Sequence, residues 1–256
     1  MFETIYITGS LIIIGIILGL IENKADFFVQ RVFGRKGIML TAWIGTPVHE
    51  FGHLFMCYLF RHKIHGFKLL DLRARNGVLG YVKHSWNQKS LYQNIGNFFI
   101  GMGPIFSGTA ALVLGMYIFL PGSFENFTNY LSLGSGQLNP YVLMNIFELT
   151  VKLFKSIFSQ ENIMSLNFWV YFISAIGISS HMALSNQDLK GAGRGLVTIF
   201  TFILLINLVV LILNADISYF FKIVLALNVY LIAFSMISIV FSLIRLLLSV
   251  LVYFVA

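Results

Sequence analysis

The sequence predicts an all-α polytopic membrane protein with about six transmembrane helices and one short β-hairpin. Of the 256 residues, 58% are hydrophobic and only 11% are charged, which is more apolar surface than a soluble domain can cover with polar side chains. The apolar residues gather in long runs, and the segment after the second run is basic and rich in strand-forming residues. A chain of this length holds about six spans of roughly 20 residues each, together with their loops.

Six apolar runs are the candidate spans. The first lacks a preceding basic segment and a small-residue cleavage site, so we interpret it as an uncleaved span rather than a signal peptide. A loop at Glu22–Gly37 is expected between the first two spans. We expect one membrane domain over residues 1–256, with a core at about 38–195 and extra spans at 5–21 and 196–256. The runs are Ile5–Ile21, Ile38–Phe60, Phe98–Leu120, Leu166–Leu184, Leu196–Leu213 and Ile217–Ala256.

The segment Arg61–Leu91 differs from the runs around it. It carries seven Lys and Arg residues against one acidic residue. Strand-like stretches at Phe67–Arg73 and Val78–Trp86 flank Asn76-Gly77, a dipeptide typical of tight hairpin turns. Basic loops favour the cytoplasmic side of a membrane. We therefore expect a cytoplasmic β-hairpin here, in an integral, multi-pass protein of a bacterial plasma membrane.

The charge and the polar residues of this loop have simple interpretations. The net charge of +7 fits loops that face the anionic leaflet of a lipid bilayer. No nucleic-acid partner is expected, because the basic residues are not concentrated in a soluble module. We interpret His62, His65 and His84 as surface residues. Cys57 is the only cysteine, which excludes an internal disulfide, and we interpret it as a small buried hydrophobe.

Two connecting segments are also informative. Pro140–Phe158 mixes apolar residues with Glu148, Lys152 and Lys155. It is interpreted either as an amphipathic helix on the outer membrane interface or as a helix packed against the spans, with equal weight. The glycine-rich stretch Gly191–Gly195 is expected to be a flexible connection.

The second run contains His49-Glu50-Phe51-Gly52-His53. Residues four apart on a helix project from the same face, so both imidazoles can reach one metal ion. Imidazole is a preferred ligand of Zn²⁺, and the neighbouring carboxylate can act as general base on a zinc-activated water. A chance match is the alternative, but ionisable groups inside a membrane span are costly and usually serve a function. The motif therefore predicts zinc bound by His49 and His53, with Glu50 as the catalytic residue.

A catalytic zinc ion needs a third protein ligand and an open position for water. Asp188 lies just beyond the fourth apolar run, on the side of the membrane where the second run ends. His181 precedes it by seven residues and would share its face on a continuous helix. We interpret Asp188 as the third ligand and His181 as a group that orients a ligand or faces the substrate. The exchange of these two roles is the alternative.

These residues together resemble the site-2 protease family of intramembrane zinc metalloproteases. The matching elements lie within about residues 38–195: the His49–His53 motif, Gly103-Pro104 in the next run, and Asp188 in a later one. The resemblance implies six spans, a membrane-associated β element after the zinc-binding helix, and an aspartate as the third zinc ligand. Gly103-Pro104 looks like that family's Gly-Pro element.

Four residues are candidates for substrate binding: Asn94, Asn97, Gly103 and Pro104. The asparagines could hold an extended substrate strand, and helix capping is the alternative. For the Gly-Pro pair the alternative is close helix packing and a kink.

The expected function is hydrolysis of peptide bonds in membrane-anchored proteins or peptides, by a zinc metalloendopeptidase of the His-Glu-x-x-His type. Two alternatives belong to other classes. Intramembrane His and Asp residues also line transport pathways, and a non-catalytic relative could bind membrane proteins without cleaving them. The sequence does not indicate an oligomeric state.

Overall fold

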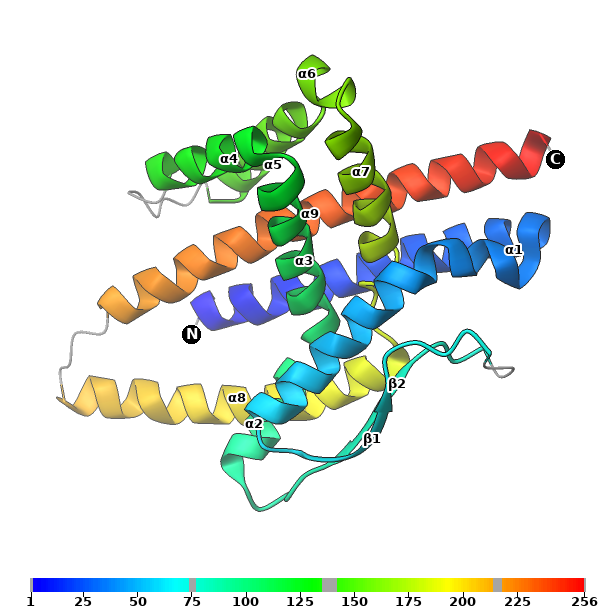
Figure 1. Ribbon diagram of the computed structural model, residues 1–256. Coiled ribbons are helices and arrows are strands. Elements are labelled where there is room, and N and C mark those ends of the chain that lie inside the picture. Colours follow the sequence, from blue (N-terminus) through cyan, green and yellow to red (C-terminus); the bar gives the residue numbers. More distant parts are fainter. Residues whose placement is uncertain (1, 74–76, 135–141, 214–217, 256) are drawn as a thin grey trace.

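The computed structural model describes residues 2–73, 77–134, 142–213 and 218–255. These residues are mostly helical and include one two-stranded antiparallel sheet, as predicted (Figure 1). In chain order the elements are α1 (Phe2–Leu59), β1 (Lys63–Lys68), β2 (Tyr81–Ser85), α2 (Leu91–Gly101), α3 (Gly103–Phe119), α4 (Pro121–Gly134), α5 (Val142–Ile157), α6 (Gln160–Ile163), α7 (Leu166–Ser179), α8 (Asn186–Leu213) and α9 (Ser218–Val255).

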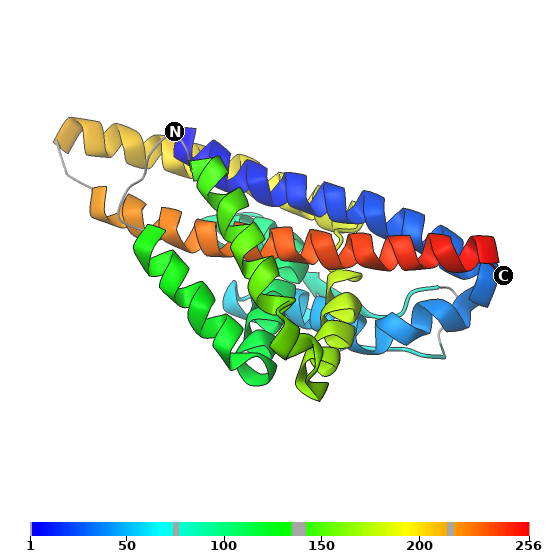
Figure 2. The same ribbon diagram turned by 90° about the horizontal axis from the view of Figure 1, so that it is seen from above.

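Helix α1 is broken at Gly34, whose backbone is non-helical with φ 58° and ψ −149°. Glycine adopts positive φ without the steric cost that a Cβ imposes. The break divides α1 into a first arm, residues 2–33, and a second arm, residues 35–59. Figures 1 and 2 show the chain turning back at this point, so that the first arm lies along α9. The predicted loop at Glu22–Gly37 is therefore wrong, because a single glycine makes the turn and the flanking residues stay helical.

The hairpin follows α1 directly. Strands β1 and β2 pair in antiparallel register from Lys63 opposite Ser85 to Lys68 opposite Tyr81, with an irregularity between Ile64 and Gly66. The predicted hairpin is confirmed, but its strand bounds differ: β1 begins four residues before the predicted Phe67 and ends five residues before the predicted Arg73, and β2 lies inside the predicted Val78–Trp86. The earlier start follows from the tight end of α1, which brings the chain into pairing at once. Gly77 has φ 79°, as a turn requires, and Asn76 lies outside the described residues.

The predicted run Phe98–Leu120 is divided between two helices. Helices α2 and α3 meet at Met102 with a bend of 57°. Pro104 lies in the first turn of α3, where its missing N–H leaves no helical hydrogen bond unmade. The bend therefore falls where the sequence has a glycine on each side of Met102 and a proline just beyond it.

Length and composition identify some of the helices as candidate membrane spans. Within the described residues, two helical segments are long and apolar enough to cross a membrane, Asn186–Val210 and Leu231–Val255. They become three if α2 and α3 count as one bent span. Helix α7 ends at Ser179, five residues before the predicted run does. Its 14 residues rise about 21 Å, which is less than the roughly 30 Å of a hydrocarbon core.

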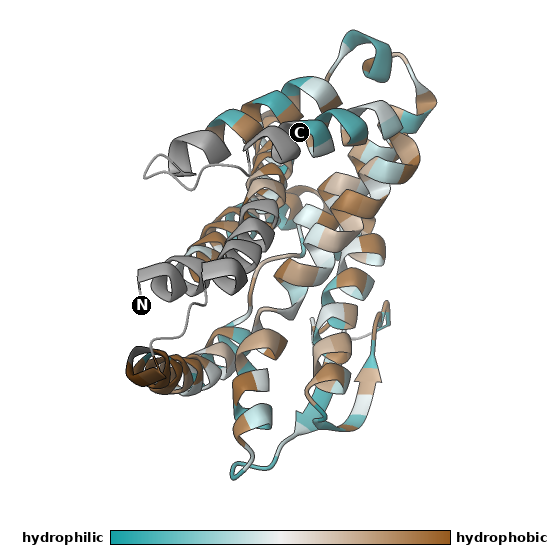
Figure 3. Ribbon diagram, turned by 90° about the vertical axis from the view of Figure 1, so that its left-hand side faces the viewer, coloured by the Kyte–Doolittle hydropathy of each residue, from teal (hydrophilic) through white to brown (hydrophobic). Residues whose placement is uncertain are grey.

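Polar residues gather at the two ends of the molecule. Figure 3 shows hydrophilic residues on α4 to α6 at one end and on the hairpin at the other, with apolar helices between them. Helix α8 exposes large apolar side chains, among them Leu204, Leu208 and Ile212. An exposed apolar face of this kind is what a lipid-facing helix presents. This distribution agrees with membrane association.

Helix α5 packs against its neighbours. Leu153 and Ile157 are fully buried in the main hydrophobic core, and α5 contacts α4 and α9. Its opposite face is polar, with an exposed ion pair between Lys152 and Glu148. Of the two interpretations of this segment, the structure favours the helix packed against the rest of the protein.

The stretch Gly191–Gly195 is helical, so the predicted flexible connection is wrong. These residues lie in α8 where it crosses α2. A Cβ on Gly195 would overlap the backbone of Phe98, and one on Gly101 would overlap Asp188 and Ala192. Gly101 and Gly195 therefore allow close packing of the two helices, and that packing brings the first turn of α8 to the second arm of α1.

Candidate metal centre

The second arm of α1 presents His49 and His53 on one face. Both side chains project the same way because they are one helical turn apart. Their Nε2 atoms lie 3.2 Å apart, and their ring centroids are 4.9 Å apart. The two imidazoles therefore converge on one point beside the helix.

Each imidazole is held by a backbone carbonyl. The Nδ1–H of His49 donates to the carbonyl oxygen of His181 at 2.6 Å, and the Nδ1–H of His53 donates to that of Ile100 at 2.7 Å. A carbonyl can only accept, so Nδ1 carries the proton in both rings. Both Nε2 atoms are then left with free lone pairs that face each other. This arrangement of carbonyl, imidazole and free nitrogen is usual around metal-binding histidines.

Asp188 completes the group from the first turn of α8. Its Oδ1 lies 3.3 Å from Nε2 of His53, and its Oδ2 lies 4.0 Å from Nε2 of His49. Ser185 caps the helix, since its hydroxyl accepts from the Asp188 N–H at 3.2 Å and its own N–H donates to Asp188 Oδ2 at 2.8 Å. This reciprocal pair is a capping box, which orients the carboxylate while one oxygen still faces the histidines.

The donor atoms of His49, His53 and Asp188 all lie within 4.8 Å of one another. In a tetrahedral site with bonds of 2.0–2.2 Å, neighbouring ligand atoms are about 3.3–3.6 Å apart. The separations of 3.2, 3.3 and 4.0 Å in the structure bracket that range. The three residues therefore fit a metal ion with small side-chain adjustments.

Glu50 lies beside this group and outside it. The side chain is buried, with 8% of its surface exposed. Gly80, the residue before β2, packs directly on it: a Cβ there would come within 2.6 Å of Glu50 Cγ and 3.0 Å of Oε1. The residue just before β2 therefore lies against the Glu50 side chain. Only glycine fits at position 80, because a Cβ there would overlap Glu50.

His181 lies apart from the ligand group. It follows the end of α7 in an irregular segment, so the predicted continuous helix from His181 to Asp188 is not present. Its Nε2 is 3.2 Å from the Thr41 hydroxyl, and its Nδ1 is 3.7 Å from Glu22 Oε1. The ring therefore points toward the first arm and the start of the second arm of α1. His181 contacts the group formed by His49, His53 and Asp188 through its backbone carbonyl oxygen, which accepts from His49 and orients that ring.

The structure brings one of the four candidate substrate-binding residues, Gly103, directly against α1. Gly103 packs against Gly52 so closely that a Cβ on either would overlap the other's backbone. Pro104 is buried beside it, and Asn97 is buried with 4% exposed. The side chain of Asn94 is engaged locally, since its Oδ1 accepts from the Trp86 indole at 3.1 Å.

The contact between Gly52 and Gly103 positions the metal group. It allows α1 to approach the junction of α2 and α3, where the Ile100 carbonyl meets His53. Ser107 strengthens the same crossing, because its hydroxyl donates to the Val48 carbonyl at 2.7 Å. The glycines at this crossing therefore bring in one of the two carbonyls that orient the histidines.

Two histidines that were predicted to lie on the surface, His62 and His84, are partly or fully buried. His62 has 5% of its surface exposed and His84 is half-buried, so the interpretation of both as surface residues is wrong. Only His65 is exposed. Burial lowers the pKa of His62, and burial together with the nearby His62 lowers the pKa of His84 to about 4. Both rings are therefore neutral at pH 7.

Comparisons with known proteins add no family assignment. No family model matches the chain, and neither does any curated protein or solved structure.

Proposed function

We propose that this protein is an intramembrane zinc metallopeptidase, related distantly to the site-2 protease family. Its substrates would be membrane-anchored proteins or peptides. One observation carries the proposal: a carboxylate from α8 meets two imidazoles from α1, and backbone carbonyls hold both imidazoles with Nε2 free. A core cluster of histidines serving only stability would not need an aspartate and two aligned lone pairs.

The donor set favours zinc. Two imidazole nitrogens and one carboxylate oxygen are typical ligands of catalytic Zn²⁺, and three protein ligands leave a fourth position for water or substrate. Bound there, zinc would supply Lewis acidity, which lowers the pKa of a water molecule and polarises a carbonyl.

Glu50 is the group of this chain that would move the proton. As the residue after His49, it stands next to the ligand group without joining it. Its carboxylate would accept the proton of the attacking water and later donate it to the leaving amine. Cover from the hairpin and burial at 8% exposure keep bulk water from competing for that proton.

Substrate entry requires movement of the hairpin or of the substrate. Gly80 lies over Glu50, so a peptide must displace or slide beneath the start of β2. Amides in a helix are engaged in backbone hydrogen bonds, and the substrate must therefore unwind before attack. A two-stranded sheet has free edges, and an unwound peptide could add to one as a third strand.

The proposal includes a multi-pass arrangement of about six spans, with the active site toward the cytoplasmic side. Each of the six predicted apolar runs coincides largely with helix, counting the two arms of α1 separately and α2 with α3. The basic hairpin next to the metal group supports the cytoplasmic orientation. Residues 2–33 and 35–59 of α1 would then be the first two spans.

The decisive experiment measures zinc and cleavage in the same preparation. Full-length protein in detergent micelles is loaded with Zn²⁺, desalted, and assayed for metal content and for hydrolysis of fluorescently labelled casein, an unfolded protein with accessible amides. Glu50→Gln should keep its zinc and lose hydrolysis. Asp188→Ala and His53→Ala should lose zinc from this centre, whereas His65→Ala, which removes an exposed histidine of the hairpin, should match the wild type in both assays.

Two results would overturn the proposal. One is wild-type protein that elutes as a single folded species and binds no zinc dependent on His53 or Asp188. The other is hydrolysis by Glu50→Gln at the wild-type rate, which would remove Glu50 from the reaction.

A further inference from the structure

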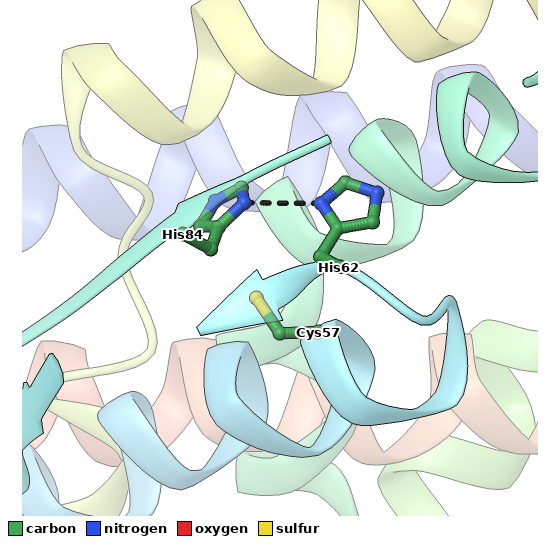
Figure 4. A group of neighbouring side chains, drawn as sticks. All are labelled: Cys57, His62 and His84. Carbon is green, nitrogen blue, oxygen red and sulfur yellow. Dashed lines mark hydrogen bonds between the residues drawn. The ribbon is translucent and has the colours of Figure 1, made fainter. Parts of the chain in front are cut away.

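We infer that Cys57, His62 and His84 form a second metal site, one helical turn from the first, which takes a zinc-class ion and fastens the hairpin to α1. The thiol sulfur of Cys57 and one nitrogen of each histidine lie within 4.8 Å of one another. Figure 4 shows the two imidazoles facing each other and the Cys57 thiol pointing from α1 toward them. The inference goes beyond the proposed peptidase activity and does not depend on it.

The end of α1 brings two of these ligands together. The His62 N–H donates to the Cys57 carbonyl at 2.9 Å, and the Arg61 N–H donates to the Tyr58 carbonyl at 3.1 Å. This pair of bonds is a Schellman motif, which folds the chain back over the last helical turn. Arg61 adopts φ 56° to close it, a conformation that is costly for a residue with a side chain. His62 is thereby returned to the level of Cys57.

The hairpin supplies the third ligand. His84 lies in β2 opposite Ile64, and its Nδ1 is 3.0 Å from Nδ1 of His62. Trp86 stacks with its ring nearly parallel to that of His62, at a centroid distance of 5.9 Å and an interplanar angle of 17°. Cys57 has no exposed surface and His62 has 5% exposed.

The protonation pattern leaves the right atoms free. The Nε2–H of His62 donates to the Gln93 carbonyl at 2.9 Å, so Nδ1 of His62 carries a lone pair that faces His84. Without a metal, a single proton on Nδ1 of His84 bridges the two rings. That hydrogen bond accounts for the histidines, but it gives no role to a thiol buried against them.

A metal ion would engage all three groups at once. On binding, the Cys57 thiol releases its proton to solvent, and His84 moves its proton from Nδ1 to Nε2, so that one thiolate and two imidazole lone pairs face the ion. Zn²⁺ prefers thiolate and imidazole, and the same set also accepts Co²⁺ as a spectroscopic substitute. Neighbouring ligand atoms in such a site are about 3.3–3.6 Å apart. Here the two Nδ1 atoms lie 3.0 Å apart and all three ligand atoms lie within 4.8 Å of one another, so an ion could bind after small side-chain adjustments.

A metal ion bound by Cys57, His62 and His84 would link the hairpin to α1. The ion would join the end of α1 to β2, and the residue just before β2 is Gly80, which covers Glu50. An occupied site would hold the hairpin against the carboxylate. An empty site would leave that contact to the His62–His84 hydrogen bond and to the packing of the two strands on α1.

Cobalt binding tests the inference directly, because Cys57 is the only cysteine of the chain. Full-length, metal-free protein in detergent micelles is titrated with Co²⁺, and the near-ultraviolet thiolate-to-cobalt absorption band is followed. The band should saturate at one equivalent for this site and disappear on addition of Zn²⁺. Cys57→Ser should abolish it, and the double variant His62→Ala/His84→Ala should weaken binding at least tenfold.

Matched variants separate this site from the first. His65→Ala should leave the band unchanged, as should His53→Ala, even though His53→Ala removes the metal at the first centre. Zinc content should be two per chain in the wild type and one in each of Cys57→Ser and His53→Ala. The inference fails if folded wild-type protein shows no thiolate band, or if the His62→Ala/His84→Ala variant binds Co²⁺ with the wild-type affinity.

Discussion

The two histidine clusters start from the same face of α1 and differ in how their remaining ligands arrive. His49, His53 and Cys57 are spaced by four residues, so one helix face feeds both clusters. The first receives Asp188 from the start of α8, far away in sequence. The second receives His62 and His84 from the helix end and the hairpin that follow within 27 residues.

The two clusters also differ in their ligand types and in the residues around them. The first has an oxygen donor from Asp188 and the Glu50 carboxylate beside it, with Gly80 packed against Glu50. The second has a thiol, two imidazoles and an indole stacked on one of them, and no carboxylate among its three ligand groups. A metal site suited to hydrolysis needs a base and an open position, whereas a structural site is closed. On this basis we propose that the first cluster serves a reaction and that the second holds a strand in place.

The largest expected effect is that of Glu50→Gln, which should remove hydrolysis while zinc stays bound. Glu50→Gln should lower hydrolysis of a cleavable substrate by about 10²–10⁴-fold, because the proton acceptor is lost while the ligands remain. Zinc content should stay at the wild-type value. Rate measurements with metal analysis on the same sample check this. Loss of zinc along with activity would show that Glu50 is instead a ligand.

The next test concerns the third ligand of the first cluster. Asp188→Ala should remove one zinc per chain and leave the cobalt–thiolate band of the second cluster intact. His181→Ala is the control, because His49 is oriented by the His181 carbonyl, which the substitution keeps. Zinc lost from His181→Ala but retained by Asp188→Ala would reverse the two roles.

A packing change should affect only the first cluster. Gly52→Ala places a methyl group against the Gly103 backbone, and such overpacking costs about 1–3 kcal/mol. Its melting temperature in micelles should fall, and zinc affinity at the first cluster should fall with it. Gly193→Ala is the matched control, since a Cβ there meets nothing within 4 Å and alanine favours a helix by about 0.5–1 kcal/mol.

The smallest expected effect comes from the cap of α8. Ser185→Ala removes the hydroxyl that accepts from Asp188, which should cost about 1 kcal/mol of stability and lower zinc affinity by about tenfold through a less ordered carboxylate. Ser165→Ala removes the equivalent cap of α7. It should cost similar stability without changing zinc affinity. Equal zinc affinities in the two variants would contradict the orienting role of Ser185.

Local sequence was sufficient for much of the fold. Long apolar runs predicted helices, and the helices formed, because helical hydrogen bonds are local and the run lengths match them. The basic segment after the second run predicted a hairpin, and β1 and β2 pair there. The spacing of His49 and His53 also predicted their shared face, since helical periodicity alone decides it.

Some signals were present in the sequence and were not used. Ser185 precedes Asp188 by three residues, which is the spacing of a capping box and marks a helix start rather than a loop. Cys57 continues the spacing of His49 and His53 by one more turn. These patterns would have placed Asp188 at the beginning of α8 and Cys57 on the metal-facing side of α1.

Other features depended on contacts between distant residues. The turn at Gly34, the packing of Gly195 on Phe98, and the meeting of Asp188 with His53 each need two elements to be placed together. The burial of His62 and His84 likewise depends on the hairpin folding back onto the end of α1. Periodicity reports which face of an element is apolar, but it does not report which partner covers that face. Helices and one pair of ligands followed from local rules, whereas the completed clusters required the assembled fold.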